Sequence, residues 1–244
     1  MLRKGCPTAD EGGDMERGLY IAASGMLAEQ IRQDQIANDL ANASTPGYKA
    51  DRTAQQPFGE LLLSNSATGQ AVGGQSTAVQ VDRVQTDWRP EPSRETGEPL
   101  DFAITGEGFF AVQTEAGPRY TRNGQFAVSP QGTLVTAQGD AVLGRDGGPV
   151  RVGADGAVDP RRLQVVALRD PRKDGDALVA GTAAGAAPGQ VRAGALEGSG
   201  ADPARSMVDM IASLRAFEAG QRVITTIDET LGRASSQVGS LSGS

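Results

Sequence analysis

Residues 38–49 read NDLANASTPGYK, and this stretch marks the end of a helix. The threonine before Pro46 is pushed out of the α region by the proline ring, so a helix has to stop here. Pro46 and Gly47 together suit a type II turn, because proline fixes the first central residue and glycine tolerates the positive φ of the second. The sequence therefore predicts a helix that ends near Asn42 and a tight turn directly after it.

A helical pattern of apolar residues leads into this turn from Met15. The pattern comprises Leu19, Ala22, Ala23, Met26, Leu27, Ile31, Ile36 and Leu40. The residues before Met15 show no periodicity, and we interpret residues 1–14 as a non-native or disordered extension ahead of the functional start. Residues 15–49 are therefore assigned to an N-terminal helix and its turn.

A second helix is predicted at the other end of the chain, over residues 202–240. Asp202 and Pro203 form a helix start, because the carboxylate accepts from first-turn amides and proline fits the first helical position. Apolar residues then recur at every seventh position: Met210, Phe217, Ile224, Leu231 and Val238. The positions three residues before this row, called companion positions here, start with the apolar Met207 and Leu214. Gln221 and Asp228 occupy the next companion positions and break the pattern.

The segment between the helices is predicted to be rich in β structure. Residues 50–99 are polar, and we interpret them as a linker or β segment. Residues 100–190 contain short β-like runs between turns, with Asn123-Gly124 as the strongest hairpin signal and Gly106-Glu107-Gly108 as another hairpin turn. Residues 191–201 return the chain to the second helix. The fold class is α+β, mainly β, with the terminal helices paired as a coiled coil and a central domain of short antiparallel strands.

Composition restricts the function. The net charge of −7 leaves no basic stripe for nucleic acid. The absence of histidine removes the commonest general base, and a single cysteine permits neither a disulfide framework nor a CxxC metal site. No apolar run of about 18 residues is present, so we expect no membrane insertion. Arg3 and Lys4 have no apolar stretch behind them, so we also expect no cleaved signal peptide. We therefore expect a protein that is not an enzyme and binds no cofactor.

Three patterns with catalytic or binding counterparts have simpler structural explanations. Gly106-Glu107-Gly108 lacks the third glycine and the following helix of a dinucleotide fingerprint. Carboxylates are numerous enough to form a glycosidase pair, but Trp88 is the only tryptophan that could support a sugar. Asp155-Gly156 lacks the EF-hand order of calcium ligands. For the terminal helices, a simpler reading also stays open, in which both cover one face of the β domain.

Residues 38–49 resemble the N-terminal motif of the bacterial flagellar rod and hook axial proteins. Later blocks resemble the same family in the same order: residues 100–110 with 120–124, residues 194–199, and residues 210–229. The likeness is closest to the proximal rod protein and next to the distal rod protein. One departure is Ser199-Gly200-Ala201, where the family commonly has Ser-Asn-Val, so a contact made by that asparagine is in question.

The resemblance implies a structural subunit of the flagellar basal-body rod, which self-assembles into the axial drive shaft that transmits torque. Its partners would be further copies, other rod and hook proteins and the flagellar export apparatus. It would reach the basal body, on the periplasmic side of the cell envelope, without a cleaved signal peptide. The assembly interface would comprise Leu19, Met26, Ile31, Leu40, Asn42, Thr45, Pro46, Gly47, Tyr48, Met207, Met210, Leu214, Phe217, Ile224, Leu231 and Val238. We expect the terminal helices of the free monomer to be largely disordered, because their partners are missing.

Two other functions remain as alternatives at this point. A secreted or phage-related β-structured binding module would use its helices only to trimerise, and it would form a small closed oligomer in solution. A wall-cutting glycosidase would lose its activity when one carboxylate of its pair is replaced. Composition does not separate the binding module from a rod subunit, and only the resemblance in ordered blocks favours the rod.

Overall fold

A computed structural model of the chain describes residues 11–64, 71–154, 156–175 and 177–241. The chain forms two compact units, each described here by itself. The first unit contains the chain up to residue 37, residues 53–84 and the chain from residue 207 onward. The second unit contains residues 38–52 and 85–206. Most of the extension expected at residues 1–14 lies outside the described residues, which begin at Glu11.

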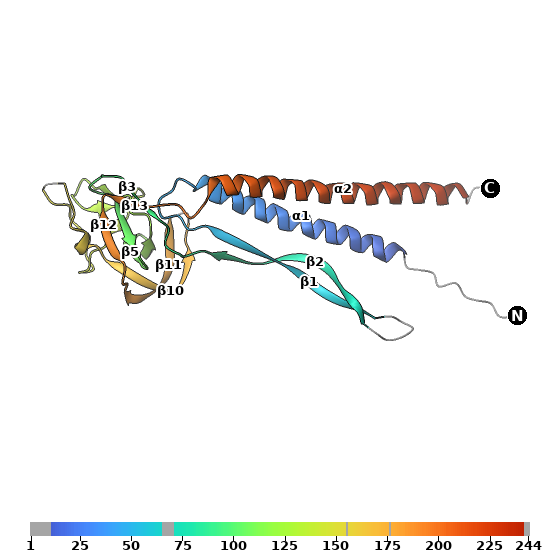
Figure 1. The fold of residues 1–244 in the computed structure, drawn as a ribbon, viewed down its shortest axis with the longest axis horizontal. Coiled ribbons are helices and arrows are strands. Elements are labelled where there is room, and N and C mark those ends of the chain that lie inside the picture. The colour runs from blue at the N-terminus through green and yellow to red at the C-terminus, as the bar shows by residue number, and fades with distance from the viewer. Residues whose placement is uncertain (1–10, 65–70, 155, 176, 242–244) are drawn as a thin grey trace. The chain divides into compact units, whose positions relative to one another are not determined.

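The first unit contains two long helices and a long β-hairpin (Figure 1). The helices are α1 (Glu11–Ala41) and α2 (Pro203–Leu241), and the hairpin pairs β1 (Asp51–Ser64) with β2 (Ala71–Thr86). Both helices were predicted, but α1 begins at Glu11, four residues before the expected start at Met15. The start of α2 agrees with the sequence, because the Asp202 carboxylate accepts from the backbone N–H of Ala204 at 3.0 Å.

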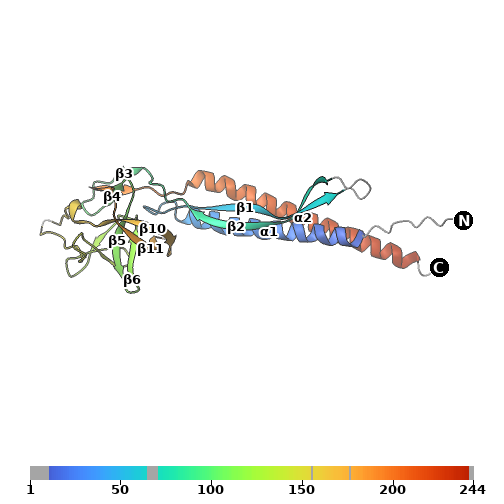
Figure 2. The same ribbon diagram turned by 90° about the horizontal axis from the view of Figure 1, so that it is seen from below.

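The helices lie side by side and run antiparallel (Figures 1 and 2). The Ser213 hydroxyl on α2 donates to the Glu29 carboxylate on α1 at 2.6 Å. Fourteen residues further along α2, Ile227 faces Gly18, whose position is eleven residues earlier on α1 than Glu29. The residue numbers of the two helices therefore run in opposite directions along the contact. The coiled-coil form of this pairing stays a prediction.

The second unit consists of short strands joined by turns. Its elements are β3 (Ser93–Glu95), β4 (Phe102–Thr105), β5 (Phe109–Thr114), β6 (Gly117–Thr121), β7 (Ala127–Val128), β8 (Leu134–Val135), β9 (Ala141–Val142), the 3-10 helix η1 (Pro160–Arg162), β10 (Val165–Lys173), β11 (Leu178–Ala186), β12 (Gln190–Ala193) and β13 (Ala195–Glu197). The main sheet has the strand order β10-β11-β6-β5-β9-β8-β7, and two small sheets pair β12 with β4 and β13 with β3. Because β10 also pairs with β5, the strands β10, β11, β6 and β5 form a closed ring.

Two apolar clusters fill the second unit. The larger contains fully buried residues such as Phe102, Phe110 and Leu134, and Phe110 meets Phe126 edge to face with ring centroids 5.3 Å apart. The smaller contains Phe109 and its neighbours on the closed ring of strands. Each large side chain that is fully buried contributes about 1.5–3 kcal/mol, so a chain poor in aromatic residues still builds a core here.

The two glycine-containing segments expected to be hairpin turns have different roles, so both predictions were wrong. Asn123-Gly124 follows β6, but β6 pairs with β5 and β11 and not with the strand after the turn. Gly124 is needed for close approach instead, because a Cβ there would lie 1.6 Å from the carbonyl oxygen of Phe102. Gly106-Glu107-Gly108 connects β4 to β5, which belong to different sheets. The segment is therefore a crossover.

No helix in the described part of the chain combines the length and apolar character needed to cross a bilayer. Within the same residues, no group of three acidic, histidine or cysteine side chains is placed to hold a metal ion.

Candidate functional site

The turn after α1 has the geometry that its sequence predicts. The backbone N–H of Tyr48 donates to the Thr45 carbonyl at 3.3 Å, and Gly47 has a φ of 67°. A type II turn requires positive φ at its third residue, which glycine adopts without strain. The Thr45 hydroxyl also donates to the side chain of Asn42 at 3.1 Å, which ties the turn to the end of the helix.

The turn packs tightly against the backbone that follows β6. A Cβ at position 47 would lie 2.3 Å from the carbonyl carbon of Arg122 and 2.7 Å from the backbone nitrogen of Asn123. The backbone N–H of Gly47 donates to the carbonyl of Glu197 at 3.1 Å. The turn residue is therefore enclosed by two segments that lie far from it in the sequence.

A buried ion cluster lies directly beside the turn. The Glu197 carboxylate accepts from Lys49 Nζ at 2.7 Å and from Arg122 at 2.8 Å. All three side chains are at most 3% exposed. Charges removed from water to this extent are tolerated only when they are paired and hydrogen-bonded, so each member depends on the others.

Backbone groups satisfy most of the remaining hydrogen bonds of this cluster. Lys49 Nζ donates to the carbonyl of Arg89 at 2.6 Å, and the backbone N–H of Glu91 donates to Glu197 at 3.0 Å. Arg122 donates to the carbonyl of Gly106 at 2.7 Å, while its Nε–H has no acceptor in the described part of the chain. The cluster thus joins the turn, the segment before β3, the β4–β5 crossover and β13.

Lys49, Arg122 and Glu197 lie in the sequence blocks that resemble the flagellar family, but the expected assembly interface did not include them. One local signal could have identified Glu197, because it is a carboxylate at the end of the buried run Ala195-Leu196. An acidic residue in a buried strand needs a cationic partner. The sequence gives no indication of which cations provide it.

A second polar cluster surrounds the buried ring of Tyr48. The Tyr48 hydroxyl donates to Asp39 at 2.8 Å, and Lys173 lies 4.2 Å from the ring centroid. Lys173 Nζ also donates to the Tyr48 hydroxyl at 3.2 Å and to Asp51 at 2.8 Å. The Asp51 carboxylate in turn accepts from Thr86 at 2.6 Å. These contacts connect the end of α1, the start of β1, the end of β2 and the end of β10.

The Asp39 carboxyl gives a testable pH dependence. Its burial raises the pKa above the ordinary value of 3.8, an effect that the Tyr48 hydrogen bond, the backbone N–H of Asp51 and the charge of Lys173 oppose. A folded-state pKa above the unfolded value means that the folded protein binds more protons, so stability falls as pH rises through this range. We expect the free energy of unfolding of the wild type, minus that of Asp39→Asn, to decrease from about pH 3 to about pH 6.

Urea denaturation at several pH values, followed by the fluorescence of Trp88, measures this difference. Asp51→Asn is a useful companion variant, because it removes a different carboxylate from the same cluster and leaves Asp39 in place. A difference between wild type and Asp39→Asn that stays constant or grows with pH contradicts the prediction.

The return segment meets the turn through backbone contacts. Ser199 donates its hydroxyl to the carbonyl of Asn42 at 2.9 Å, and the backbone N–H of Gly200 donates to the carbonyl of Tyr48 at 2.8 Å. A Cβ at position 200 would lie 3.1 Å from that Tyr48 oxygen and 3.2 Å from the backbone nitrogen of Ala50. The glycine at the departure from the family pattern therefore fits a tight site, and the segment is held without an asparagine side chain.

The α2 residues that face α1 form a row different from the one expected. The least exposed positions follow the heptad spacing of three and four: Met210, Ser213, Phe217, Gly220, Ile224 and Ile227. The positions that complete the row facing α1 therefore lie three residues after Met210, Phe217 and Ile224. Met207 and Leu214, which lie three residues before Met210 and Phe217, are exposed in the single chain. Gln221 and Asp228 are exposed, which explains why polar residues are accepted there.

Small residues in this row allow the helices to approach closely. A Cβ at Gly220 would lie 2.7 Å from Cγ of Met26, and Ser213 is only 1% exposed. A groove of about 380 Å³ lies between the helices at this level. The helix contact is therefore built from glycine, serine and alanine as much as from large apolar side chains.

The other expected interface residues lie in three environments. Leu40 is half-buried, as are Met26, Asn42, Thr45 and Pro46, whereas Gly47 and Tyr48 are buried in the turn. Exposed apolar side chains remain on both helices: Leu19, Tyr20, Leu27, Ile31, Met207, Val208, Ile211, Leu214, Val223 and Leu231. The Val238 side chain lies outside the described ones. The two helices thus retain a large apolar surface in a single chain.

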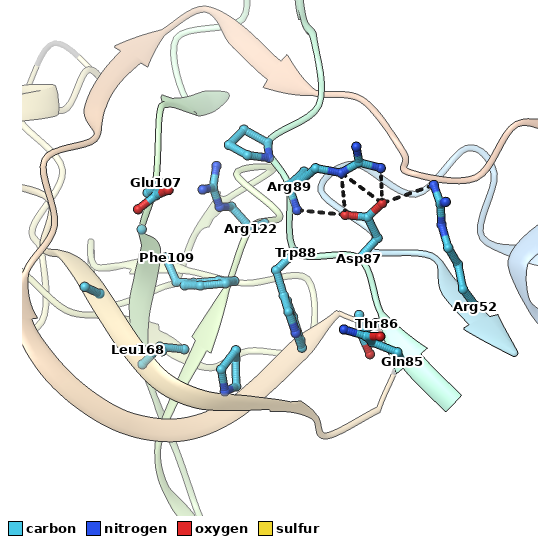
Figure 3. A pocket seen from close by; sticks show the side chains of 14 residues that line it. Arg52, Gln85, Thr86, Asp87, Trp88, Arg89, Glu107, Phe109, Arg122 and Leu168 are labelled. Carbon is cyan, nitrogen blue, oxygen red and sulfur yellow. Dashed lines mark hydrogen bonds and ion pairs between the residues drawn. The ribbon is translucent and has the colours of Figure 1, made fainter. Parts of the chain in front are cut away.

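A pocket of about 580 Å³ lies within the second unit, beside Trp88 (Figure 3). Trp88 meets Phe109 edge to face, with ring centroids 5.8 Å apart, and Leu168 lies near both. At the rim, Asp87 accepts from Arg89 Nε at 2.9 Å and from Arg52 at 3.2 Å. The hydrogen bonds from Arg89 hold the pKa of Asp87 well below its usual value, so this carboxylate stays ionised.

Comparison with protein families finds matches in three successive parts of the chain. Residues 19–49 match a family described as flagella basal body rod protein. Residues 103–165 match the D1 domain of the flagellar hook protein FlgE/F/G, and residues 192–237 match the C-terminal part of the flagellar basal body rod FlgEFG protein. The turn lies in the first match, Arg122 in the second and Glu197 in the third, so the buried ion cluster joins all three.

Curated relatives match over nearly the whole chain. The flagellar basal-body rod protein FlgF of Salmonella typhimurium is 35% identical, with 90% of this chain and 97% of the relative covered. FlgF of Caulobacter vibrioides is 32% identical, with coverage of 93% and 100%. The flagellar basal-body rod protein FlgG of Bacillus subtilis is 30% identical, with coverage of 89% and 97%.

Proposed function

The chain belongs to the family of flagellar basal-body rod proteins, and on this premise we propose that its antiparallel helices and their exposed apolar residues hold neighbouring subunits together. The protein is a structural subunit of the rod in the flagellar basal body. Its relatives are structural proteins, and its partners are other axial proteins of the flagellum. We also propose that the chain is more similar to the proximal rod protein than to the distal rod protein.

One observation carries the proposal of self-assembly. Tyr20 and Leu27 on α1, and Val208 and Ile211 on α2, are between 53% and 66% exposed. A monomeric soluble protein seldom leaves this many large apolar side chains in water along the same elements. Neighbouring subunits that bury them would gain about 1.5–3 kcal/mol for each side chain that becomes fully buried. Repeated along a tube, such contacts would give a shaft stiff enough to transmit torque.

The remaining parts of the proposal concern export and location. We infer that the chain reaches the periplasmic part of the basal body through the export apparatus of the flagellum. Helices whose apolar faces are completed only by neighbours suit such a route, because they can pass unfolded and order on assembly. The coiled-coil form of the helix layer belongs to this proposal as well.

The decisive experiment places a charge on the exposed apolar surface. In Leu27→Glu and Ile211→Glu, the new carboxylate would have to be buried at a subunit contact without a partner, which costs several kcal/mol. We expect cells that produce only one of these variants to lack complete rods and to be non-motile. Electron microscopy of isolated basal bodies and swarm plates measure both effects.

Gln221→Glu is the matched control, because it introduces the same carboxylate at an exposed position of α2 away from the contact with α1. We expect this variant to form rods and swim. The urea unfolding of the second unit, followed by Trp88, should be unchanged in all three variants. Normal rods in Leu27→Glu and Ile211→Glu would refute the proposed interface, and a small closed oligomer of the purified protein would favour a binding module instead.

A further inference from the structure

The side of α1 that points away from α2 carries a row of exposed side chains. Gly18 and Ala22 line the groove against α2. Leu27 and Ile31 follow these two residues by nine positions, which is two and a half turns of helix, so they lie on the opposite side. Tyr20 shares that side, because it lies seven residues before Leu27. Tyr20, Leu27 and Ile31, the α1 outer row, are 64%, 63% and 45% exposed.

The side of α2 that points away from α1 carries a second row. Phe217 and Gly220 belong to the row that faces α1, and Val208 and Ile211 precede them by nine residues. Ala219 lies three full turns after Val208, so it shares the outward side, and it is exposed. Ala219, Ile211 and Val208 form the α2 outer row. The two outer rows therefore lie on opposite sides of the helix pair, and one chain cannot bring its own rows together.

The two rows have matching lengths and complementary shapes when one is read backwards. Each spans eleven residues, in steps of seven and four on α1 and, read backwards, of eight and three on α2. An antiparallel contact between them gives three pairs: Tyr20 with Ala219, Leu27 with Ile211, and Ile31 with Val208. The largest side chain thus meets the smallest, and the aliphatic side chains meet one another, as close packing requires.

The same register brings opposite charges together at the next step. Asp34 follows Ile31 by three residues on α1, and Arg205 precedes Val208 by three residues on α2. Both charged side chains are exposed. Neither was used to align the rows, so a carboxylate opposite a guanidinium is independent support for the register. Arg205 has five N–H donors and can bind this carboxylate in addition to its contacts within its own chain.

We propose that the α1 outer row of one copy binds the α2 outer row of a second copy in this register. The inference rests on the proposed function, since it names the partner of the surface that holds subunits together. Within one chain Met26 faces Gly220, whereas Leu27 meets Ile211 of the second copy, so that copy is displaced along the helix axis. The two surfaces differ, and a displaced head-to-tail contact of this kind repeats as an open helical array.

Cysteine cross-linking in isolated basal bodies tests the register. Cells produce only a Cys6→Ser chain with Leu27→Cys and Ile211→Cys, because Cys6 is the single cysteine of the protein. We expect oxidation to join copies into a ladder of dimers and higher oligomers on a non-reducing gel. A disulfide requires Cα atoms within about 7 Å of each other, so two positions on opposite sides of one helix pair cannot form it within a chain.

Two controls distinguish this register from other packings. Arg222→Cys replaces Ile211→Cys in the first control and should give no ladder, because it lies on the same side of α2 but about 16 Å further along. Leu27→Cys alone should give no dimer, and a dimer would show that α1 meets α1 instead. Assembled rods without a ladder from the Ile211 pair, or with one from the Arg222 pair, would overturn the inference and leave the proposed helix interface standing.

Charge exchange tests the register without cysteines. Asp34→Arg and Arg205→Asp should each reduce the swarm diameter about twofold or more, because each places like charges at the contact. The chain with both changes should recover, since the charges are exchanged across the contact. Asp34→Arg combined with Arg233→Asp, which reverses an exposed arginine of α2 outside the contact, should not recover. Normal swarming of the single variants, or no recovery in the first double variant, would exclude this pairing.

Discussion

Glu197→Gln should lower the free energy of unfolding of the second unit by about 3–5 kcal/mol. The substitution keeps the size of the side chain but removes the carboxylate that pairs with both Lys49 and Arg122 in the buried cluster. Both cations would then remain in a site that is almost completely closed to water. Since Trp88 is half-buried in the same unit, urea denaturation followed by its fluorescence measures the loss.

Glu95→Gln is the matched control for this prediction. Glu95 pairs with Arg192 at 2.9 Å on the neighbouring strand β3, but the two side chains are 80% and 54% exposed. Exposed ion pairs contribute about 0–1 kcal/mol, so this variant should unfold close to the wild type. A Glu197→Gln protein that also stays within about 1 kcal/mol of the wild type would show that the buried cluster does not hold the unit together.

The consequence for function follows from the position of the cluster. Lys49 belongs to the turn after α1, and Glu197 belongs to the strand that leads back to α2. The cluster therefore fixes, within the second unit, the two points at which the chain turns toward its terminal helices. We expect Glu197→Gln to impair rod formation in proportion to its loss of stability, whereas Glu95→Gln should not.

The ends of the helices were predictable because local chemistry determines them. Thr45-Pro46-Gly47 excludes continued helix and supplies the positive φ of the turn, and Asp202 caps α2 through its own side chain. None of these contacts depends on distant parts of the chain. The true start of α1 was missed, because Glu11 lies in a stretch without apolar periodicity.

The helix contact was only partly predictable, because apolar periodicity identifies large side chains and does not identify the small ones that complete the contact. Met210, Phe217 and Ile224 were correctly placed in one row, but the positions that complete it are Ser213, Gly220 and Ile227. A glycine or serine gives no apolar signal in a sequence pattern. Its value is steric, since Gly220 leaves space for Met26, and this becomes visible only when the partner helix is present.

The ion cluster and the two wrongly predicted turns could not be derived from the sequence for another reason: both depend on contacts between residues that lie far apart in the chain. Glu197 meets partners that lie 148 and 75 residues away, and no spacing rule relates them. Asn123-Gly124 looked like a hairpin turn because this dipeptide suits one locally. Its glycine is required by the backbone of Phe102, which approaches from a different strand.

Gly47→Ala is expected to have the second large effect on stability. Gly47 has a φ of 67°, where an L side chain costs about 1–2 kcal/mol. A Cβ would also lie 2.3 Å from the carbonyl carbon of Arg122, and neither backbone can move without disturbing the neighbouring ion cluster. Overpacking of this kind costs a further 1–3 kcal/mol or so, which gives a total loss of about 2–5 kcal/mol in the free energy of unfolding.

Gly132→Ala separates the two contributions. Gly132 has a similar φ of 74°, but a Cβ there would meet nothing within 4 Å. This variant should therefore lose only about 1–2 kcal/mol, from backbone strain alone. Urea denaturation measures the free energy of unfolding of both variants, and the difference between them is the cost of the collision between the new Cβ and the Arg122 backbone. If Gly47→Ala is no less stable than Gly132→Ala, the turn does not pack against the Arg122 backbone as described, and the link between the turn and the ion cluster has to be abandoned.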